Sequence, residues 1–150
     1  MDPIEEFRYL VLAIQREGNK LFADHLRPLG LTPSQAEVLR VMSAHDSLTL
    51  SELGGLLVCE TTASPSRLVD RLVAAGFVNR EIGPSRRSVS LSLTDSGKEL
   101  ELKVRDAEEQ LYASLTPLLD EGGLDSTLRS LRRVAEAFPA GRALARRKAI

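Results

Sequence analysis

The chain lacks the features of a membrane-spanning protein or of a secreted protein stabilised by disulfides. Its 150 residues include no tryptophan, two tyrosines, four phenylalanines and one cysteine. A single cysteine cannot form an internal disulfide, and no apolar run approaches the roughly 20 residues of a membrane span. The acidic N-terminus also lacks the basic region and apolar run of a secretory signal. We therefore expect a cytoplasmic protein.

The motifs of common enzyme classes are missing as well. The sequence has no Gly-x-Ser-x-Gly turn and no phosphate-binding loop, and its two histidines, His25 and His45, have no partners at metal-ligand spacing. An aromatic content of 4% argues against a protein that stacks single-stranded bases. We expect no enzymatic activity, no metal and no other cofactor.

What the chain does have is a regular pattern of apolar residues at helical spacing. A long amphipathic helix is predicted over residues 3–26. Thr32 and Thr49 each begin a capping box, Thr-Pro-Ser-Gln and Thr-Leu-Ser-Glu, so two short helices follow. A fourth helix ends at Gly76 and begins between residues 62 and 64, because Pro65 lacks an amide hydrogen and belongs in the first turn.

A β-hairpin follows the fourth helix. Residues 77–80 and 89–93 fit strands, the second with strict apolar and polar alternation, and 83–85 form the turn. Beyond the hairpin, a helix is predicted from about residue 95 to 119, and Glu121-Gly122-Gly123 is expected to break it. One last amphipathic helix is then expected, with the basic run 142–148 as its solvated end.

This order of elements is typical of a winged helix-turn-helix protein. The expected fold class is mainly α with a small β-hairpin wing. Residues 32–93 are expected to form the DNA-binding region, and 1–31 with 94–150 a helical dimerisation region. Three amphipathic helices from one chain give only a thin core, so a second copy is expected to complete it.

The distribution of charge supports this division, although the net charge is only −1. Residues 61–98 carry six basic and three acidic side chains, and 129–150 carry seven and one. The acidic side chains prevail in 1–60 and 99–128. Because local potential decides where a polyanion docks, a nearly neutral chain can still present a basic face.

The candidate DNA contacts lie on the fourth helix and at the tip of the wing. Hydroxyls at the start of a recognition helix bind bases or phosphates, and arginine binds guanine through two hydrogen bonds. Arginines on a wing reach a minor groove or phosphates. The candidate residues are Thr62, Ser64, Ser66, Arg67, Arg71, Arg86 and Arg87.

These segments resemble the MarR (multiple-antibiotic-resistance regulator) family of bacterial winged helix-turn-helix regulators. The residues that carry the resemblance are Ser66-Arg67-Leu68-Val69-Asp70-Arg71-Leu72, Gly76-Phe77-Val78, Arg87 and Leu93-Thr94-Asp95-Ser96-Gly97. The resemblance implies a homodimer on a pseudo-palindromic duplex, with each recognition helix in a major groove. It also implies a repressor relieved by a small aromatic ligand, bound between the dimerisation and DNA-binding regions.

The resemblance implies roles for particular residues too. Arg87 matches the wing arginine of the family. Ser85 stands where the family usually has an aspartate, so a wing salt bridge is expected to be absent here. Asp70 is expected to pair with a nearby arginine and to be structural.

Two alternatives are also considered. A winged helix can serve protein contacts alone, but the arginines of the fourth helix and wing oppose this. A redox-responsive regulator using Cys59 is the second alternative, although a buried thiol packing as a small apolar group is favoured.

Overall fold

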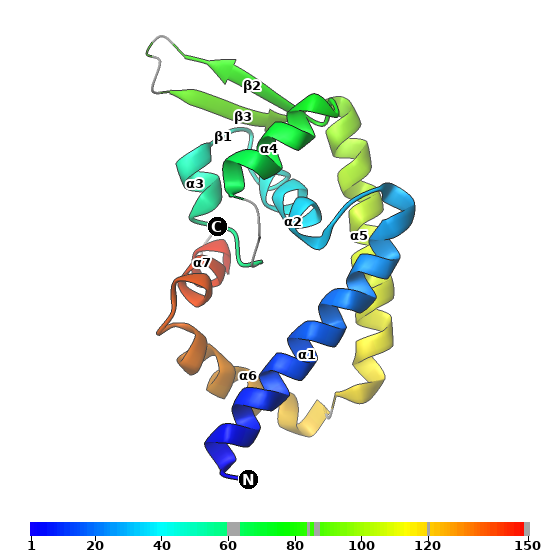
Figure 1. The fold of residues 1–150 in the computed structure, drawn as a ribbon, viewed down its shortest axis with the longest axis vertical. Coiled ribbons are helices and arrows are strands. Elements are labelled where there is room, and N and C mark those ends of the chain that lie inside the picture. The colour runs from blue at the N-terminus through cyan, green and yellow to red at the C-terminus, as the bar shows by residue number, and fades with distance from the viewer. Residues whose placement is uncertain (60–63, 84, 86–87, 120, 149–150) are drawn as a thin grey trace.

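The computed structural model describes residues 1–59, 64–83, 85, 88–119 and 121–148. Within these ranges the chain is mainly helical with one small antiparallel sheet, which confirms the expected fold class (Figure 1). The elements in chain order are α1 (Pro3–Leu26), η1 (Arg27–Leu29), α2 (Pro33–Met42), β1 (Leu48–Thr49), α3 (Leu50–Gly54), α4 (Pro65–Ala74), β2 (Val78–Ile82), β3 (Val89–Leu93), α5 (Asp95–Leu115), η2 (Thr116–Leu118), α6 (Glu121–Ala135) and α7 (Pro139–Lys148).

Local capping explains where the first helices begin. Both predicted capping boxes are present: Thr32 exchanges hydrogen bonds with Gln35 at the start of α2, and Thr49 does so with Glu52 at the start of α3. Each box satisfies two backbone amides that a helix terminus would otherwise leave without partners. Gly76 lies just after the C-cap residue of α4. Its φ of 81° is a left-handed conformation that favours glycine.

The wing contains the predicted hairpin and one further strand. β2 and β3 pair antiparallel, with Val78 opposite Leu93 and Ile82 opposite Val89. β1 pairs with the other edge of β3, which places Leu48 opposite Leu91 and gives the order β1-β3-β2. A strand of two residues is too short to show alternation, so the sequence pattern did not indicate it.

The winged helix and α5 share one core. Eight large side chains from α1, α2, α3, α4, β3 and α5 are less than 2% exposed: Leu26, Val38, Leu39, Leu53, Val69, Leu72, Leu91 and Val104. Val104 and the neighbouring Leu100 bring α5 into the same apolar cluster. Helix α5 is therefore anchored directly on the winged helix.

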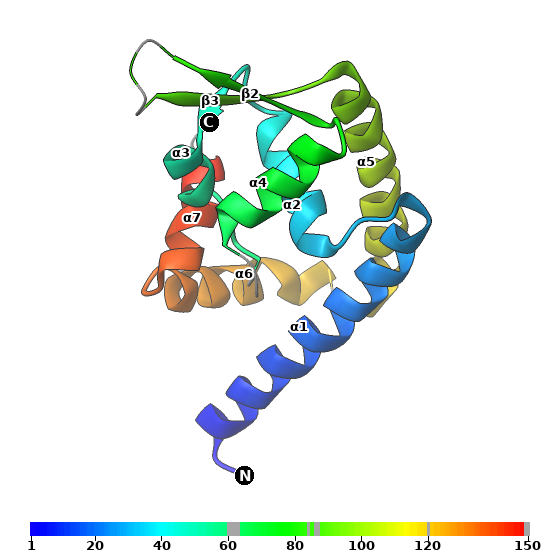
Figure 2. The same cartoon turned by 45° about the horizontal axis from the view of Figure 1, so that its top comes forward.

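Helix α1 packs against α5, and its N-terminal half extends away from the winged helix (Figures 1 and 2). Leu26 at its end is completely buried, but Ile4 and Ile14 are 76% and 71% exposed. The apolar stripe predicted from the sequence is thus present, and Ile4 and Ile14 on it are left largely uncovered by the described part of the chain.

The C-terminal prediction was wrong in its boundaries. α5 ends at Leu115, a 3-10 turn follows, and Glu121-Gly122-Gly123 begins α6 instead of breaking a helix. The expected single last helix is two helices, and α7 returns to α3 (Figure 1). The helix break comes before Pro139, because proline disfavours a helical conformation in the residue that precedes it.

Candidate nucleic-acid interface

Helix α4 has a buried face and an exposed face, as expected for a recognition helix. Leu68, Val69 and Leu72 are 3%, 0% and 1% exposed and fix the helix on the core. Arg67 and Arg71 lie on the opposite, exposed face. Neither arginine pairs with an acidic side chain among the described residues. The structure therefore presents two guanidinium groups to an external acceptor.

The acidic residue on the outer face of α4 is already paired. Asp70 accepts a hydrogen bond from Arg80 of β2, with 2.5 Å between the nitrogen and the oxygen. Both side chains are substantially exposed, so the pair contributes little to stability, but it ties α4 to the wing. This confirms the structural pairing expected for Asp70.

The start of α4 leaves its first amides without a side-chain cap. Ser64 is the N-cap residue, yet its hydroxyl contacts the hydroxyl of Ser66 at 2.9 Å and caps no amide of α4 among the described residues. Pro65 occupies the first turn, as predicted. Uncapped amides and the positive end of the helix dipole favour an anion at this point. Thr62 lies outside the described residues.

The wing turn is held by serines. The Gly83 amide donates to the Ser88 carbonyl at 2.7 Å, and the Ser88 amide donates to the Ser85 carbonyl at 3.0 Å. The Ser88 hydroxyl also donates to the Ser85 carbonyl at 3.1 Å. Ser85 thus takes part in backbone turn hydrogen bonds at the position where the resemblance implies an aspartate. Arg86 and Arg87 lie outside the described residues.

The connection between α3 and α4 has polar partners that the sequence did not indicate. Glu37 of α2 accepts hydrogen bonds from the amides of Val58 and Cys59, each at 2.8 Å. Arg147 of α7 forms an ion pair with Glu37, and Arg146 binds the Gly55 carbonyl. The expectation of a solvated helix end was therefore wrong for Arg147, which is partly buried against Glu37, whereas Arg146 is exposed although it binds a carbonyl. A run of arginines signals charge, but it does not say which carbonyls the side chains reach.

Cys59 lies half-buried beside this connection. Burial, followed by the charge of Glu37 and a hydrogen bond to it, raises the pKa of the thiol to about 12. At neutral pH the group is therefore a protonated thiol and a poor nucleophile, since the thiolate is the reactive form.

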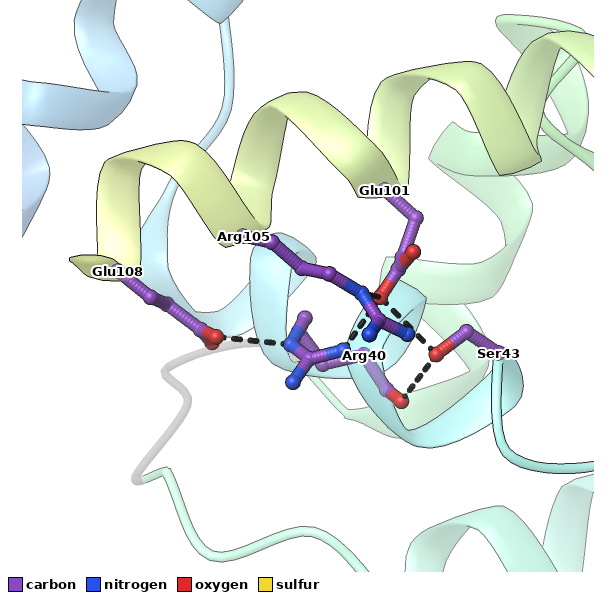
Figure 3. A network of polar contacts seen from close by, with 5 residues as sticks. All are labelled: Arg40, Ser43, Glu101, Arg105 and Glu108. Carbon is purple, nitrogen blue, oxygen red and sulfur yellow. Dashed lines mark hydrogen bonds and ion pairs between the residues drawn. The ribbon is translucent and has the colours of Figure 1, made fainter.

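A buried carboxylate joins α2 to α5. Glu101 of α5 is 3% exposed and contacts Arg40, Ser43 and Arg105 (Figure 3). Arg40 also donates to Glu108 at 2.8 Å. Burial by itself would raise the pKa of Glu101, but hydrogen bonds from Arg105, Arg40 and Ser43 outweigh it and lower that pKa. No periodicity or motif distinguishes these residues in the sequence.

Two grooves flank the exposed helix and its connection. One of about 840 Å³ opens between α3, the first turn of α4 and β3. Another of about 550 Å³ lies between α1, α5 and the Val58–Cys59 segment, with Phe22 and Leu111 in its wall.

Across the described ranges, no three acidic, histidine or cysteine side chains gather in a way that would hold a metal ion. None of the described helices is apolar and long enough to cross a membrane.

An exposed arginine-bearing helix, set on a three-helix core beside a β-wing, defines a winged helix-turn-helix protein. Residues 31–89 match the model of the MarR family. MarR from Escherichia coli strain K12 is 29% identical over 113 residues, which cover 71% of this chain and 78% of that protein. MarR from Salmonella typhimurium strain LT2 is 26% identical over 113 residues, again covering 71% of this chain and 78% of that protein.

Solved structures agree with this assignment. A mutant MarR from E. coli complexed with operator DNA has a TM-score of 0.76 at 25% identity, covering 89% of this chain and 99% of that one. The S. aureus MepR–DNA complex has a TM-score of 0.79 over 88% and 98%, and at 21% identity it supports the fold alone. Residues 31–89 thus match the MarR family, and the chain is similar in sequence and fold to MarR transcriptional regulators.

Proposed function

We propose that this regulator is a homodimer that binds a pseudo-palindromic site in double-stranded DNA. The observation that carries the proposal is the outer face of α4, where Arg67 and Arg71 are exposed while the inner face is buried. The MarR and MepR structures bound to DNA support the same use of this fold. A protein that acts on bacterial DNA works in the cytoplasm, so that is the location we infer.

Each candidate contact residue is assigned a role from its place in α4 or, for Thr62, Arg86 and Arg87, from its place in the sequence. Ser66 and Arg67, in the first turn of α4, read base edges in the major groove. Ser64 at the start of α4 and Arg71 in its last turn bind phosphates, and Thr62 is assigned the same role from its place in the sequence. Arg86 and Arg87 belong to the wing and reach the adjacent minor groove or its phosphates. Phosphate contacts set the register of the protein, and base contacts set its sequence preference.

Dimerisation uses the apolar surface outside the winged helix. Residues 1–31 and 94–150 form this region, and 32–93 form the DNA-binding region. Ile4, Ile14 and Leu118 are 76%, 71% and 79% exposed, and Phe138 is 59% exposed. Such a concentration of exposed apolar side chains marks a protein interface in a folded chain. A symmetric dimer places two α4 helices on successive turns of one DNA face.

Repression is relieved by a small aromatic ligand. The groove between α1, α5 and the Val58–Cys59 segment has a size suited to such a molecule, since ligand pockets span roughly 300–1,000 Å³. It adjoins both the proposed dimerisation helices and the connection to α4. A ligand there alters DNA affinity by favouring one position of the winged helix over another.

The described residues favour DNA binding over two alternative functions, a winged helix used only for protein contacts and a redox-responsive regulator that uses Cys59. A module used only for protein contacts does not need unpaired arginines on the exposed face of α4. A redox-responsive regulator needs a thiolate at neutral pH, and the raised pKa of Cys59, about 12, opposes that.

The test is selection of bound DNA from a random pool, followed by affinity measurements at several salt concentrations and with candidate aromatic ligands. We expect a palindromic consensus and an affinity that falls steeply with salt, because bound phosphates release counterions. Arg67→Ala is expected to change the base preference, whereas Arg87→Ala weakens binding to all sites.

Arg133→Ala serves as the matched control, because Arg133 is an exposed arginine of α6 outside the proposed DNA interface. Binding that is independent of salt would contradict the proposal. If Arg67→Ala changes neither affinity nor preference, α4 is not the recognition helix.

A further inference from the structure

The short connection that leads from α3 to α4 is held from two sides. From α2, the carboxylate of Glu37 spans two successive amides, with Oε1 accepting from Val58 and Oε2 from Cys59 at 2.8 Å each. This arrangement fixes the direction of the chain at Val58 and Cys59, on the way to α4. The side chain of Glu37 is only 9% exposed, so these hydrogen bonds form largely out of water.

From the other side, α7 supplies two arginines. Arg146 donates from Nε and Nη2 to the Gly55 carbonyl, at 3.1 and 2.6 Å. Arg147 donates from Nε to the Leu56 carbonyl at 2.6 Å, and its Nη2 binds Glu37. The carbonyls of residues 55 and 56 come at the C-terminal end of α3, where a helix leaves carbonyls without internal partners.

The chemistry of Arg147 suits a positioning role. Its planar guanidinium binds a backbone carbonyl and a carboxylate at the same time, which a lysine ammonium does not do in a fixed geometry. The side chain is 28% exposed, so the charge of Glu37 is neutralised in a partly dry environment. Charge-assisted hydrogen bonds are about twice as strong as neutral ones.

We propose that α7 is a positioning element for the recognition helix, with Arg147 and Glu37 as the pair that sets the α3–α4 connection in its DNA-binding geometry. This inference rests on the proposed DNA binding. Arg147 itself does not contact DNA. It acts through the connection, so its loss changes how often α4 occupies the binding position and leaves the number of bound phosphates unchanged.

The experiment compares Arg147→Ala, Arg147→Lys and Glu37→Gln with Arg133→Ala, each as the full chain, on the duplex selected for the native protein. We expect the first three variants to bind on the order of tenfold more weakly, a size typical of residues that act through a coupled element. Their salt slope and base preference stay those of the native protein. Arg133→Ala, which removes the same charge elsewhere, binds like the native protein.

A second measurement does not involve DNA. Hydrogen exchange of the Val58 and Cys59 amides in the free protein is expected to be faster in Arg147→Ala than in the native chain and unchanged in Arg133→Ala. If the native chain binds no DNA, the proposed function fails. The exchange rates still test whether Arg147 and Glu37 hold the Val58 and Cys59 amides in place. If Arg147→Ala binds and exchanges like the native protein, the inference is wrong. A salt slope reduced by about one also overturns it, since Arg147 would then bind a phosphate directly.

Discussion

Arg40 and Glu101 show how single charged residues connect the winged helix to the long helix α5. Glu101 is almost completely buried, and its carboxylate has three donors around it (Figure 3). Burial of a charge is costly unless it is paired and hydrogen-bonded, and here both conditions are met. The pair therefore specifies how α2 lies on α5.

At the residue scale, we expect Glu101→Gln to lower the free energy of unfolding by about 1–3 kcal/mol at pH 7, because it leaves Arg40 and Arg105 without their shared anion. The pKa of Glu101 is lower in the folded protein than its ordinary value, 4.5. The stability it contributes is thus complete above that value and is lost as the pH falls through the folded-state pKa. Urea unfolding at pH 7 and at pH 4 measures the effect.

The matched control for this prediction is Glu99→Gln on the same helix. Glu99 is exposed and pairs with no charged side chain in the part of the chain that the structure describes. Its replacement is expected to change stability by less than about 0.5 kcal/mol. An equal loss in both variants, or a loss for Glu101→Gln that does not shrink at low pH, would contradict the assigned role of Glu101.

At the scale of elements, the junction between the wing and α5 depends on a close backbone approach. Thr94 caps α5, its hydroxyl donating to the Gly76 carbonyl at 2.7 Å and accepting from the Gly97 amide at 3.0 Å. A Cβ atom on Gly97 would lie 2.0 Å from the Phe77 carbonyl oxygen. The sequence of this junction resembles the family, but only the packing explains why residue 97 is glycine.

Gly97→Ala is accordingly expected to lower the unfolding free energy by about 1–3 kcal/mol, because the backbone of Phe77 has to move. Gly18→Ala is the matched control: beyond its own stretch of helix, no atom of the described residues lies within 4 Å of a Cβ added there, and a helix interior favours alanine over glycine. That change is expected to raise stability by about 0.5–1 kcal/mol. Thermal unfolding of both variants tests the pair, and a tolerated Gly97→Ala would refute the packing argument.

At the scale of the whole molecule, the exposed apolar stripe of α1 leads us to expect a dimer in solution. Ile14→Glu places a charge on that stripe, and since Ile14 is 71% exposed within one chain, the fold of the protomer is expected to persist. The dimer is expected to dissociate at micromolar protein concentration, because burying an unpaired carboxylate is unfavourable. Sedimentation velocity measures the change.

Ile82→Glu is the comparison for the oligomeric state. Ile82 is 74% exposed but lies on β2, in the wing rather than the proposed dimerisation region (Figure 1). This variant is expected to remain a dimer. A native chain that sediments as a monomer, or an Ile14→Glu variant that still forms a dimer, would show that α1 is not the interface.

The sequence by itself determined the features that depend on neighbouring residues. The two capping boxes, the extent of α1 and the inner face of α4 all follow from contacts within one or two helical turns, which periodicity and spacing record. Local signals failed where a glycine pair was expected to end a helix and α6 begins instead.

Only the tertiary structure decided which distant residues meet. Glu37 and Arg147 stand far apart in sequence, and so do Arg40 and Glu101, yet each pair holds two elements together. A charged side chain in a sequence does not specify its partner, because long-range pairing depends on how all the elements pack. The winged helix-turn-helix was therefore predictable, whereas the contacts that set its recognition helix were not.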